Sequence, residues 1–363
     1  MKKIASAAIV FMVAAVSLCI IFNMDFSEVD FSDGFTKQIE KSVADAVPMK
    51  EKLSEFMTRI RFISGVRYLD DIYIGDDGSL LRDVQEPNSR TVSTARNYIL
   101  SFAENNDCDT YFMLIPTSSV IKQQEITAYA SENLFNQHHL INEMYSELYG
   151  KLNTVEVYQS LFSHRNEYIY YHTESFPTGL GGYYIYRELA GRMNLKAKTL
   201  GEFSAAYAAH NFYGSLASEK LRPYASPDFV SLYEYSEQKI NYTVNYYSGG
   251  EKIESRDGLH IYDENKVKDK TDMILGNFYP LCEIESDIEE RNSLLVFADS
   301  TVKSWIPFIT PHYNKIMIVN LDELSDEDVA LINVKSYDKV LFAYGVDSFT
   351  SGIDFKRIGD IGA

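Results

Sequence analysis

Basic residues are scarce in this sequence. Its 363 residues include 34 Lys and Arg against 52 Asp and Glu, which gives a formal net charge of −18. A nucleic-acid groove or an anionic lipid surface needs a basic patch, so we expect neither nucleic acid nor a charged membrane surface as the main partner. We interpret the negative charge chiefly as a contribution to solubility.

Cysteine is also scarce, with three residues in the chain. Cys19 falls in an apolar N-terminal run, which leaves Cys108 and Cys282 outside it. The sequence leaves open whether these two pair. A chain that is 45% hydrophobic can bury a core large enough to need no disulfide.

Motifs for metals and nucleotides are lacking too. Among the seven histidines no pair has the helical spacing of zinc ligands, apart from the neighbours His138 and His139 on a surface-like helix. The glycines of TGLGGYY have the wrong spacing for a dinucleotide turn, and GDDGS belongs to a hairpin. We therefore predict no metal and no cofactor.

One long apolar run is present, at the N-terminus. Lys2 and Lys3 precede the uncharged residues 4–22, a run about long enough to cross a bilayer as a helix. We predict that residues 1–22 are a single-pass membrane anchor with the rest of the chain outside the cytoplasm. A cleaved signal peptide is the alternative, but no convincing small-x-small site follows the run. Residues 23–45 then predict a stalk and the start of a first helix, with short helices on either side of Pro48.

Hydrophobic periodicity predicts an α/β fold for residues 46–363. Alternating residues around Asp77-Gly78 predict a hairpin, and residues 91–105 predict a helix. Further on, short apolar runs alternate with amphipathic ones, the pattern of a mostly parallel sheet with helices on both faces. The predicted strands are 109–117, 154–158, 167–171, 293–298, 315–320 and 339–344; the predicted helices are 132–149, 179–193, 301–312 and 325–332. Residues 205–282 interrupt the rhythm and predict a tyrosine-rich, antiparallel inserted subdomain.

Two strand ends carry candidate catalytic residues. Ser300 is placed where an apolar strand meets a helix, where backbone N–H groups can stabilise an oxyanion, but Asp299 or Ser300 could equally cap the helix. His172 and Glu174 are two residues apart and would share a face of an extended strand, as a base and the carboxylate that orients it. A half-buried polar strand end explains the same pattern.

The chain resembles the DHHW family of bacterial envelope proteins, which are similar to the SGNH-hydrolase-like proteins that O-acetylate alginate. The resemblance is carried by several long blocks in the family's order: ADAVPMKEK, DDIYIGDDGSLL, YFMLIPTSS, EYIYYHTESFPTGLGGYYIYREL, NFYGSLASEK, LGNFYPL, ADSTVKSWIPFITPHYNKI and KVLFAYGVDSF. It implies an SGNH-like three-layer α/β/α fold, a nucleophilic serine late in the chain and an Asp-x-His pair before it.

Carried over by position, the nucleophile is Ser300, preceded by Asp299 as in the family. Where the family reads Thr-Asp-His-His-Trp-Thr, residues 173–178 read TESFPT, so Glu174 replaces the orienting aspartate and Phe176 the base histidine. Phenylalanine cannot accept a proton. The other residues expected to line the site are Thr173, Ser175 and Asn277, the last a doubtful oxyanion-hole donor because Phe278 takes the family's asparagine position.

Losing the base removes most of the catalysis of a serine triad, because its members act as a unit. The resemblance therefore implies an inactive member, linked to O-acetylation or binding of cell-envelope polysaccharide. One alternative is an active O-acyl esterase or acetyltransferase that uses Ser300 with a rewired His172 and Glu174. The other is a structural envelope protein whose aromatic insertion contacts a glycan or a partner protein.

Overall fold

The computed structural model describes residues 60, 62 and 65–361. Backbone contacts divide the chain into Met1–Arg67 and Tyr68–Ala363, and nearly all of the described residues belong to the second unit. The predicted anchor, the stalk and the helices around Pro48 lie outside the described residues. Among the residues that are described, no helix is both long enough and apolar enough to cross a membrane.

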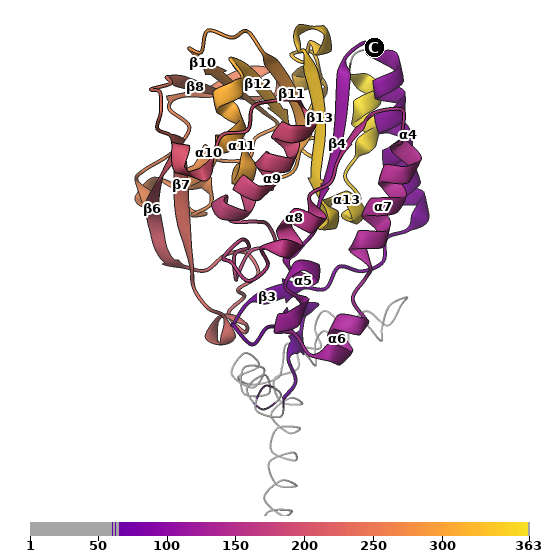
Figure 1. Cartoon of the computed structure of the whole chain (residues 1–363), viewed down its shortest axis with the longest axis vertical. Helices are drawn as coiled ribbons and strands as arrows, with labels where there is room; N and C mark the ends of the chain where they lie inside the picture. The colour runs from indigo at the N-terminus through magenta and orange to yellow at the C-terminus, as the bar shows by residue number, and fades with distance from the viewer. Residues whose placement is uncertain (1–59, 61, 63–64, 362–363) are drawn as a thin grey trace, which may run out of the picture. The chain divides into compact units, whose positions relative to one another are not determined.

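Helices and strands alternate through most of the second unit (Figure 1). The strands are β1 (Tyr68–Leu69), β2 (Ile72–Ile74), β3 (Leu80–Arg82), β4 (Asp109–Ile115), β5 (Asn153–Val155), β6 (Phe203–Phe212), β7 (Asp228–Tyr235), β8 (Tyr242–Ser248), β9 (Glu251–Asp257), β10 (Leu281–Ser286), β11 (Ser293–Ala298), β12 (Lys315–Val319) and β13 (Lys339–Gly345). The α-helices are α4 (Ser89–Asn105), α5 (Ser118–Ile121), α6 (Ala128–Glu132), α7 (Gln137–Leu148), α8 (Tyr158–Ser163), α9 (Gly179–Arg192), α10 (Asp272–Leu275), α11 (Val302–Ile309), α12 (Asp326–Val329) and α13 (Val346–Ser351). Short 3-10 turns are η1 (Gln123–Glu125), η2 (Leu200–Glu202), η3 (Arg222–Tyr224), η4 (Glu264–Lys266), η5 (Thr310–His312), η6 (Val334–Ser336) and η7 (Phe355–Asp360).

The described residues build one large sheet of eight strands, in the order β5-β4-β13-β11-β12-β10-β8-β9. The first five strands run parallel to one another, and β10, β8 and β9 continue the sheet in antiparallel fashion. The predicted mixed α/β fold with a mostly parallel sheet is confirmed. The predicted hairpin at Asp77-Gly78 is confirmed too, as β2 and β3.

Helices cover both faces of the sheet, which makes three layers (Figure 1). Strand β4 illustrates why: Phe112 and Leu114 pack with apolar residues of α4 and α7, whereas Met113 and Ile115 pack with those of α9 and α11. A strand that is buried on both faces needs a nearly continuous apolar run, and DTYFMLI supplies it. The same holds for β11 and β13 at the centre of the sheet.

Helices α9 and α11 approach each other unusually closely on one face. A Cβ atom added to Gly182 in α9 would lie 1.8 Å from the carbonyl oxygen of Ser304 in α11 and 2.8 Å from the backbone nitrogen of Trp305. Glycine at position 182 therefore lets one helix backbone rest on the other. This contact holds the helix that begins just after Ser300.

Some sequence-based assignments are wrong. Residues 167–171 form no strand; a single bridge pairs Tyr170 with Pro177 inside a run of bends. The predicted strand 154–158 ends early, at Val155, and an unpredicted helix, α8, follows. The 205–282 region does not stand apart as a whole, because β8 and β9 extend the central sheet and only β6 and β7 form their own two-stranded ribbon. Cys108 is half-buried, Cys282 is buried, and both are free.

Acid is expected to weaken the fold at His312. Its Nε2 atom lies 2.8 Å from the Tyr186 hydroxyl, and burial, helped by nearby Lys198, lowers the pKa of His312 to about 4. An unfolded histidine titrates near pH 6.5, so at acidic pH the unfolded chain binds the proton more readily than the folded one. The folded state therefore loses stability relative to the unfolded state as pH falls from about 6.5 toward 4. We expect His312→Gln to reduce the drop in melting temperature between pH 7 and pH 5 by about 2 °C. Circular dichroism melts at both pH values measure it, and equal drops in both proteins would contradict it.

Candidate active site

A hollow of about 230 Å³ lies where β11, β12 and β13 end. Ser300 lies two residues after the end of β11, Asn320 directly follows β12, and Tyr344 is the penultimate residue of β13. All three line this hollow. The carboxyl ends of neighbouring parallel strands are where α/β sheets usually carry their sites. The hollow is therefore the candidate active site of the described chain.

Asp299 organises the turn that presents Ser300. Its Oδ1 atom accepts hydrogen bonds from the backbone N–H and the hydroxyl of Thr301, and its Oδ2 atom accepts one from the backbone N–H of Gly345, 2.9 Å away. Burial raises the pKa of Asp299 above its ordinary value. Asp299 thus closes the turn before α11 and does not cap the helix, whose N-cap is Thr301 and has no side-chain capping hydrogen bond. Ser300 is half-buried, and its hydroxyl makes no hydrogen bond among the described residues.

A second carboxylate, Asp347, lies beside Asp299. A Cβ atom on Gly345 would lie 2.7 Å from Oδ1 of Asp347 and 3.1 Å from Oδ2 of Asp299, so both acids contact the same glycine. Burial raises the pKa of Asp347, and hydrogen bonding that involves Ser348 and Ser175 partly offsets this. Ser175 is thus placed next to Asp347.

The carboxylate of Glu174 contacts the loop that follows β6. Its Oε1 atom accepts from the backbone N–H of Ser215 at 2.6 Å, and its Oε2 atom accepts from the Ser215 hydroxyl at 2.7 Å. Thr173 holds the same loop, because its hydroxyl accepts from Gly214 N–H and its carbonyl accepts from Leu216 N–H. Burial raises the pKa of Glu174. This carboxylate anchors a loop in place of orienting a base.

Phe176, in the position of the family's base histidine, is a core residue. Its ring is 7% exposed and meets the edge of the Tyr171 ring, with centroids 5.6 Å apart. Both belong to an apolar cluster beneath the β6–β7 ribbon that includes Phe212 and Met273. Phe176 does not line the hollow around Ser300. The slot for the base is thus filled by a side chain that packs under the ribbon.

His172 pairs with acids on other elements. Its backbone N–H donates to Oδ1 of Asp228 at 2.7 Å, and its ring lies 3.4 Å from the same oxygen and 3.9 Å from Oδ2 of Asp77. Asp77 is the partner of buried Lys122. The expectation that His172 and Glu174 share a strand face is wrong, since residues 172–176 are bends. Within the described chain no hydrogen bond links His172 or Glu174 to Ser300.

Asn277 and Ser300 lie in different hollows. Asn277 donates to the Tyr279 hydroxyl and lines a second hollow of about 480 Å³, together with Glu174. Its neighbour Phe278 lines the Ser300 hollow. Sequence reasoning missed Asp347, Asn320 and Tyr344, whose only signal is their position at the ends of β12 and β13. Tyr344 is buried, and its hydroxyl has no partner among the described residues.

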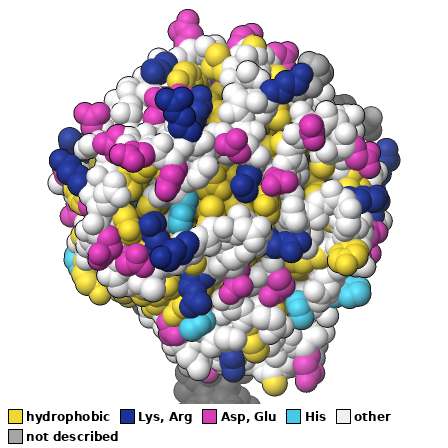
Figure 2. All heavy atoms as spheres, turned by 45° about the horizontal axis from the view of Figure 1, so that its top comes forward, with side chains coloured by type: hydrophobic (Ala, Val, Ile, Leu, Met, Phe, Trp, Pro, Cys, Tyr) yellow, Lys and Arg dark blue, Asp and Glu magenta, His cyan; other side chains and the backbone are white. Residues whose placement is uncertain are grey.

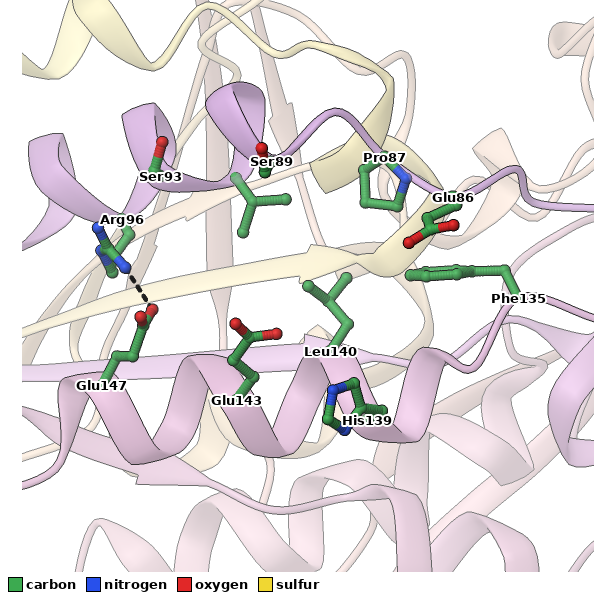
Figure 3. A pocket seen from close by; sticks show the side chains of 11 residues that line it. Glu86, Pro87, Ser89, Ser93, Arg96, Phe135, His139, Leu140, Glu143 and Glu147 are labelled. Atoms are coloured by element: carbon green, nitrogen blue, oxygen red, sulfur yellow. Dashed lines mark hydrogen bonds and ion pairs between the residues drawn. The ribbon is translucent and has the colours of Figure 1, made fainter.

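No other part of the described surface offers a clearer site. A hollow of about 350 Å³ between α4 and α7 shares no residue with the Ser300 hollow; Figure 3 shows Arg96 paired with Glu147 across it and carboxylates along its rim. Acidic and basic side chains are interspersed on the face drawn in Figure 2. Across residues 60, 62 and 65–361, no three His, Cys, Asp or Glu side chains are grouped to hold a metal ion.

The sequence model of DHHW proteins matches residues 92–319. The chain belongs to the DHHW family. Among solved structures, a DHHW family protein from Eubacterium siraeum aligns with a TM-score of 0.66 at 18% identity, covering 81% of this chain and 96% of that one. PatB1 from Bacillus cereus aligns with a TM-score of 0.61 at 17% identity, over 78% and 98%. Its form with a sulfonyl adduct gives 0.62 at 14%, over 78% and 99%. None of the curated proteins matches this chain. The resemblance to the DHHW family is thus confirmed, and the solved structures support the fold.

Proposed function

We propose that this DHHW-family protein serves cell-envelope polysaccharide, as a binding or scaffolding partner of O-acetylation, and has no serine–histidine catalysis of its own. The scaffold is SGNH-like, with Ser300 in the position of the nucleophile. In this proposal residues 4–22 anchor the chain in the membrane and the described unit acts outside the cytoplasm.

One observation carries the proposal: among the described residues that line the hollow around Ser300 there is no histidine to act as its base. The hollow that Ser300 lines is walled by acids, an amide and aromatic rings, and contains no histidine. Phe176 packs in an apolar cluster and Glu174 binds Ser215, so the segment that carries the Asp-x-His pair in the family holds the insertion loop instead. A serine hydroxyl without a base is a poor nucleophile at neutral pH.

The rewired enzyme is the second candidate, with His172 as the base. The contacts of His172 speak against it, because the ring lies between Asp228 and Asp77 and not at the Ser300 hydroxyl. A purely structural envelope protein is the third candidate. It shares the prediction of no turnover but does not require glycan binding.

Turnover that depends on Ser300 separates the rewired enzyme from the other two candidates, and glycan binding separates those two from each other. We expect wild type and Ser300→Ala to release acetate from an aryl acetate and from acetylated glycans at the same rate, no faster than the uncatalysed reaction, because a triad without its base loses several orders of magnitude. A sulfonyl fluoride provides a second readout, since a sulfonyl adduct is known for PatB1. We expect no labelling at Ser300 by mass spectrometry. Turnover or labelling that disappears in Ser300→Ala would overturn the proposal.

A further inference from the structure

The ribbon of β6 and β7 carries an exposed aromatic surface away from the Ser300 hollow. Tyr207 in β6 is 67% exposed, and its ring lies 5.5 Å from that of Phe229 in β7 and 6.1 Å from that of His210. We call Tyr207, His210 and Phe229 the aromatic platform. None of the three lines the hollow around Ser300, the hollow around Asn277 or the one between α4 and α7.

A bulge in β6 brings the platform onto one face. Tyr207 pairs with Ser231 and His210 pairs with Phe229, but Ala208 has no partner in the register. Residues 207 and 210 would point to opposite faces of a regular strand, and the extra residue turns them to the same one. The opposite face of the ribbon is occupied, since Ala209, Val230 and Leu232 pack in the cluster with Phe176. The ribbon is therefore held by its buried face and displays its aromatic face.

Contacts with Tyr168 hold the aromatic platform in place. Phe229 stacks on Tyr168, with ring centroids 4.5 Å apart and planes 23° apart. The Tyr168 hydroxyl donates to buried Asp228 at 2.6 Å, and Asp228 also accepts from the backbone N–H groups of His172 and Thr173. The Tyr207 ring is tilted by 60° against Phe229, so the exposed ring rests on a pair that is itself held in place, and little conformational entropy remains to be lost on binding.

The strand that carries Tyr207 has no acidic, Lys or Arg side chain. Strand β6 reads FSAAYAAHNF, without Asp, Glu, Lys or Arg, in a chain whose formal charge is −18. Ala205, two residues before Tyr207 and on the same face of the strand, is exposed and small, so it leaves room along the strand for a ligand that lies on the tyrosine ring. Strand β6 offers a charged macromolecule no Asp, Glu, Lys or Arg to pair with, whereas the apolar C–H face of a sugar ring matches an aromatic face flanked by polar Tyr and His tips.

We propose that the aromatic platform binds a neutral stretch of glycan chain, with one sugar ring stacked on Tyr207. This inference rests on the proposed function only for the ligand class, because the platform is separate from the Ser300 hollow. The proposal gives a binding role to the β6–β7 ribbon, which is not part of the eight-stranded central sheet. Because the platform is separate from the Ser300 hollow, we expect it to bind glycan whether or not Ser300 is catalytic.

The test is calorimetric titration of the full chain with chito-oligosaccharide and cello-oligosaccharide probes. We expect Tyr207→Ala to bind about tenfold more weakly than wild type and Tyr207→Phe to bind as wild type does, because the ring and not the hydroxyl makes the contact. Tyr149→Ala is the matched control, since Tyr149 is 85% exposed and lies at the end of α7. It should bind as wild type does.

Any other result would contradict the proposal that the aromatic platform binds glycan. No binding of either probe by wild type would do so, as would equal binding by Tyr207→Ala or equal losses in Tyr207→Ala and Tyr149→Ala. Self-association that is lost in Tyr207→Ala, without glycan binding, would assign the surface to protein contact instead. Because Tyr207 is exposed, its variants should keep the melting temperature of wild type, which the same samples report. The aryl acetate assay is independent: glycan binding that is unchanged in Tyr207→Ala would contradict the platform alone, whereas no glycan binding by wild type would also favour the purely structural candidate over the proposed function.

Discussion

Replacing Gly182 with alanine is expected to lower the free energy of unfolding by about 3 kcal/mol or more, because the two helices beside the candidate site would have to separate. The added Cβ atom would lie 1.8 Å from the Ser304 carbonyl oxygen and 2.2 Å from its carbonyl carbon. Backbone atoms cannot move aside as a flexible side chain can. The helix that must shift contains Trp305, which is fully buried, so the displacement spreads into the core. Urea unfolding followed by tryptophan fluorescence measures the loss, and Trp305 is the only tryptophan in the chain.

Gly191→Ala is the matched control in the same helix. Gly191 lies near the end of α9, it is exposed, and a Cβ atom there would meet nothing within 4 Å. Alanine has the higher helix propensity, so this variant should be as stable as wild type or more stable by up to about 1 kcal/mol. If both variants unfold at the same urea concentration as wild type, the close contact between α9 and α11 is contradicted.

The sheet could be predicted from the sequence because its central strands are buried on both faces. Strand β11 was predicted with its observed bounds and β13 within one residue, since each is a short apolar run between polar turns. Residues 167–171 look similar but form no strand. Tyr170 and Tyr171 are instead buried in different apolar clusters, so the tyrosines serve packing between layers and no neighbouring strand pairs with them. Hydrophobic periodicity alone does not distinguish an apolar run that pairs as a strand from one whose side chains pack between layers without pairing.

The candidate site was predictable only in part. Ser300 and Asp299 could be found, because a strand end and a helix start are adjacent in sequence. Asn320 and Tyr344 come from other strand ends, and their meeting with Ser300 depends on the strand order β13-β11-β12. Asp347 follows β13 and meets Asp299 at Gly345. The direction in which Glu174 points could not be predicted either, since its partner, Ser215, is 41 residues away. The aromatic platform depends on a bulge, which leaves no simple mark in a sequence.

Gly214 shows how far residues 173–176 have been adapted to hold the insertion loop. A Cβ atom at this position would lie 2.2 Å from Oε1 of Glu174, so the loop backbone rests directly on the carboxylate. Glu174, Thr173 and Phe176 all face the ribbon or its loop. A segment committed to these contacts cannot turn a base toward Ser300 without giving them up. Phe176 is therefore part of the packing of the ribbon, and placing a histidine at this position alone should not create catalysis.

Phe176→His is accordingly expected to destabilise the protein by about 3 kcal/mol, through lost apolar contacts and a buried ring N–H without a partner. We also expect it to gain no acetate release that depends on Ser300. Urea unfolding and the aryl acetate assay measure the two effects, the latter also in the Phe176→His/Ser300→Ala double variant. Phe176→Leu is the control, since it keeps the site apolar and should cost only about 1 kcal/mol. A histidine variant as stable as wild type, with turnover that disappears in the double variant, would mean that the segment can leave the cluster and reach Ser300, and the anchoring role would be wrong.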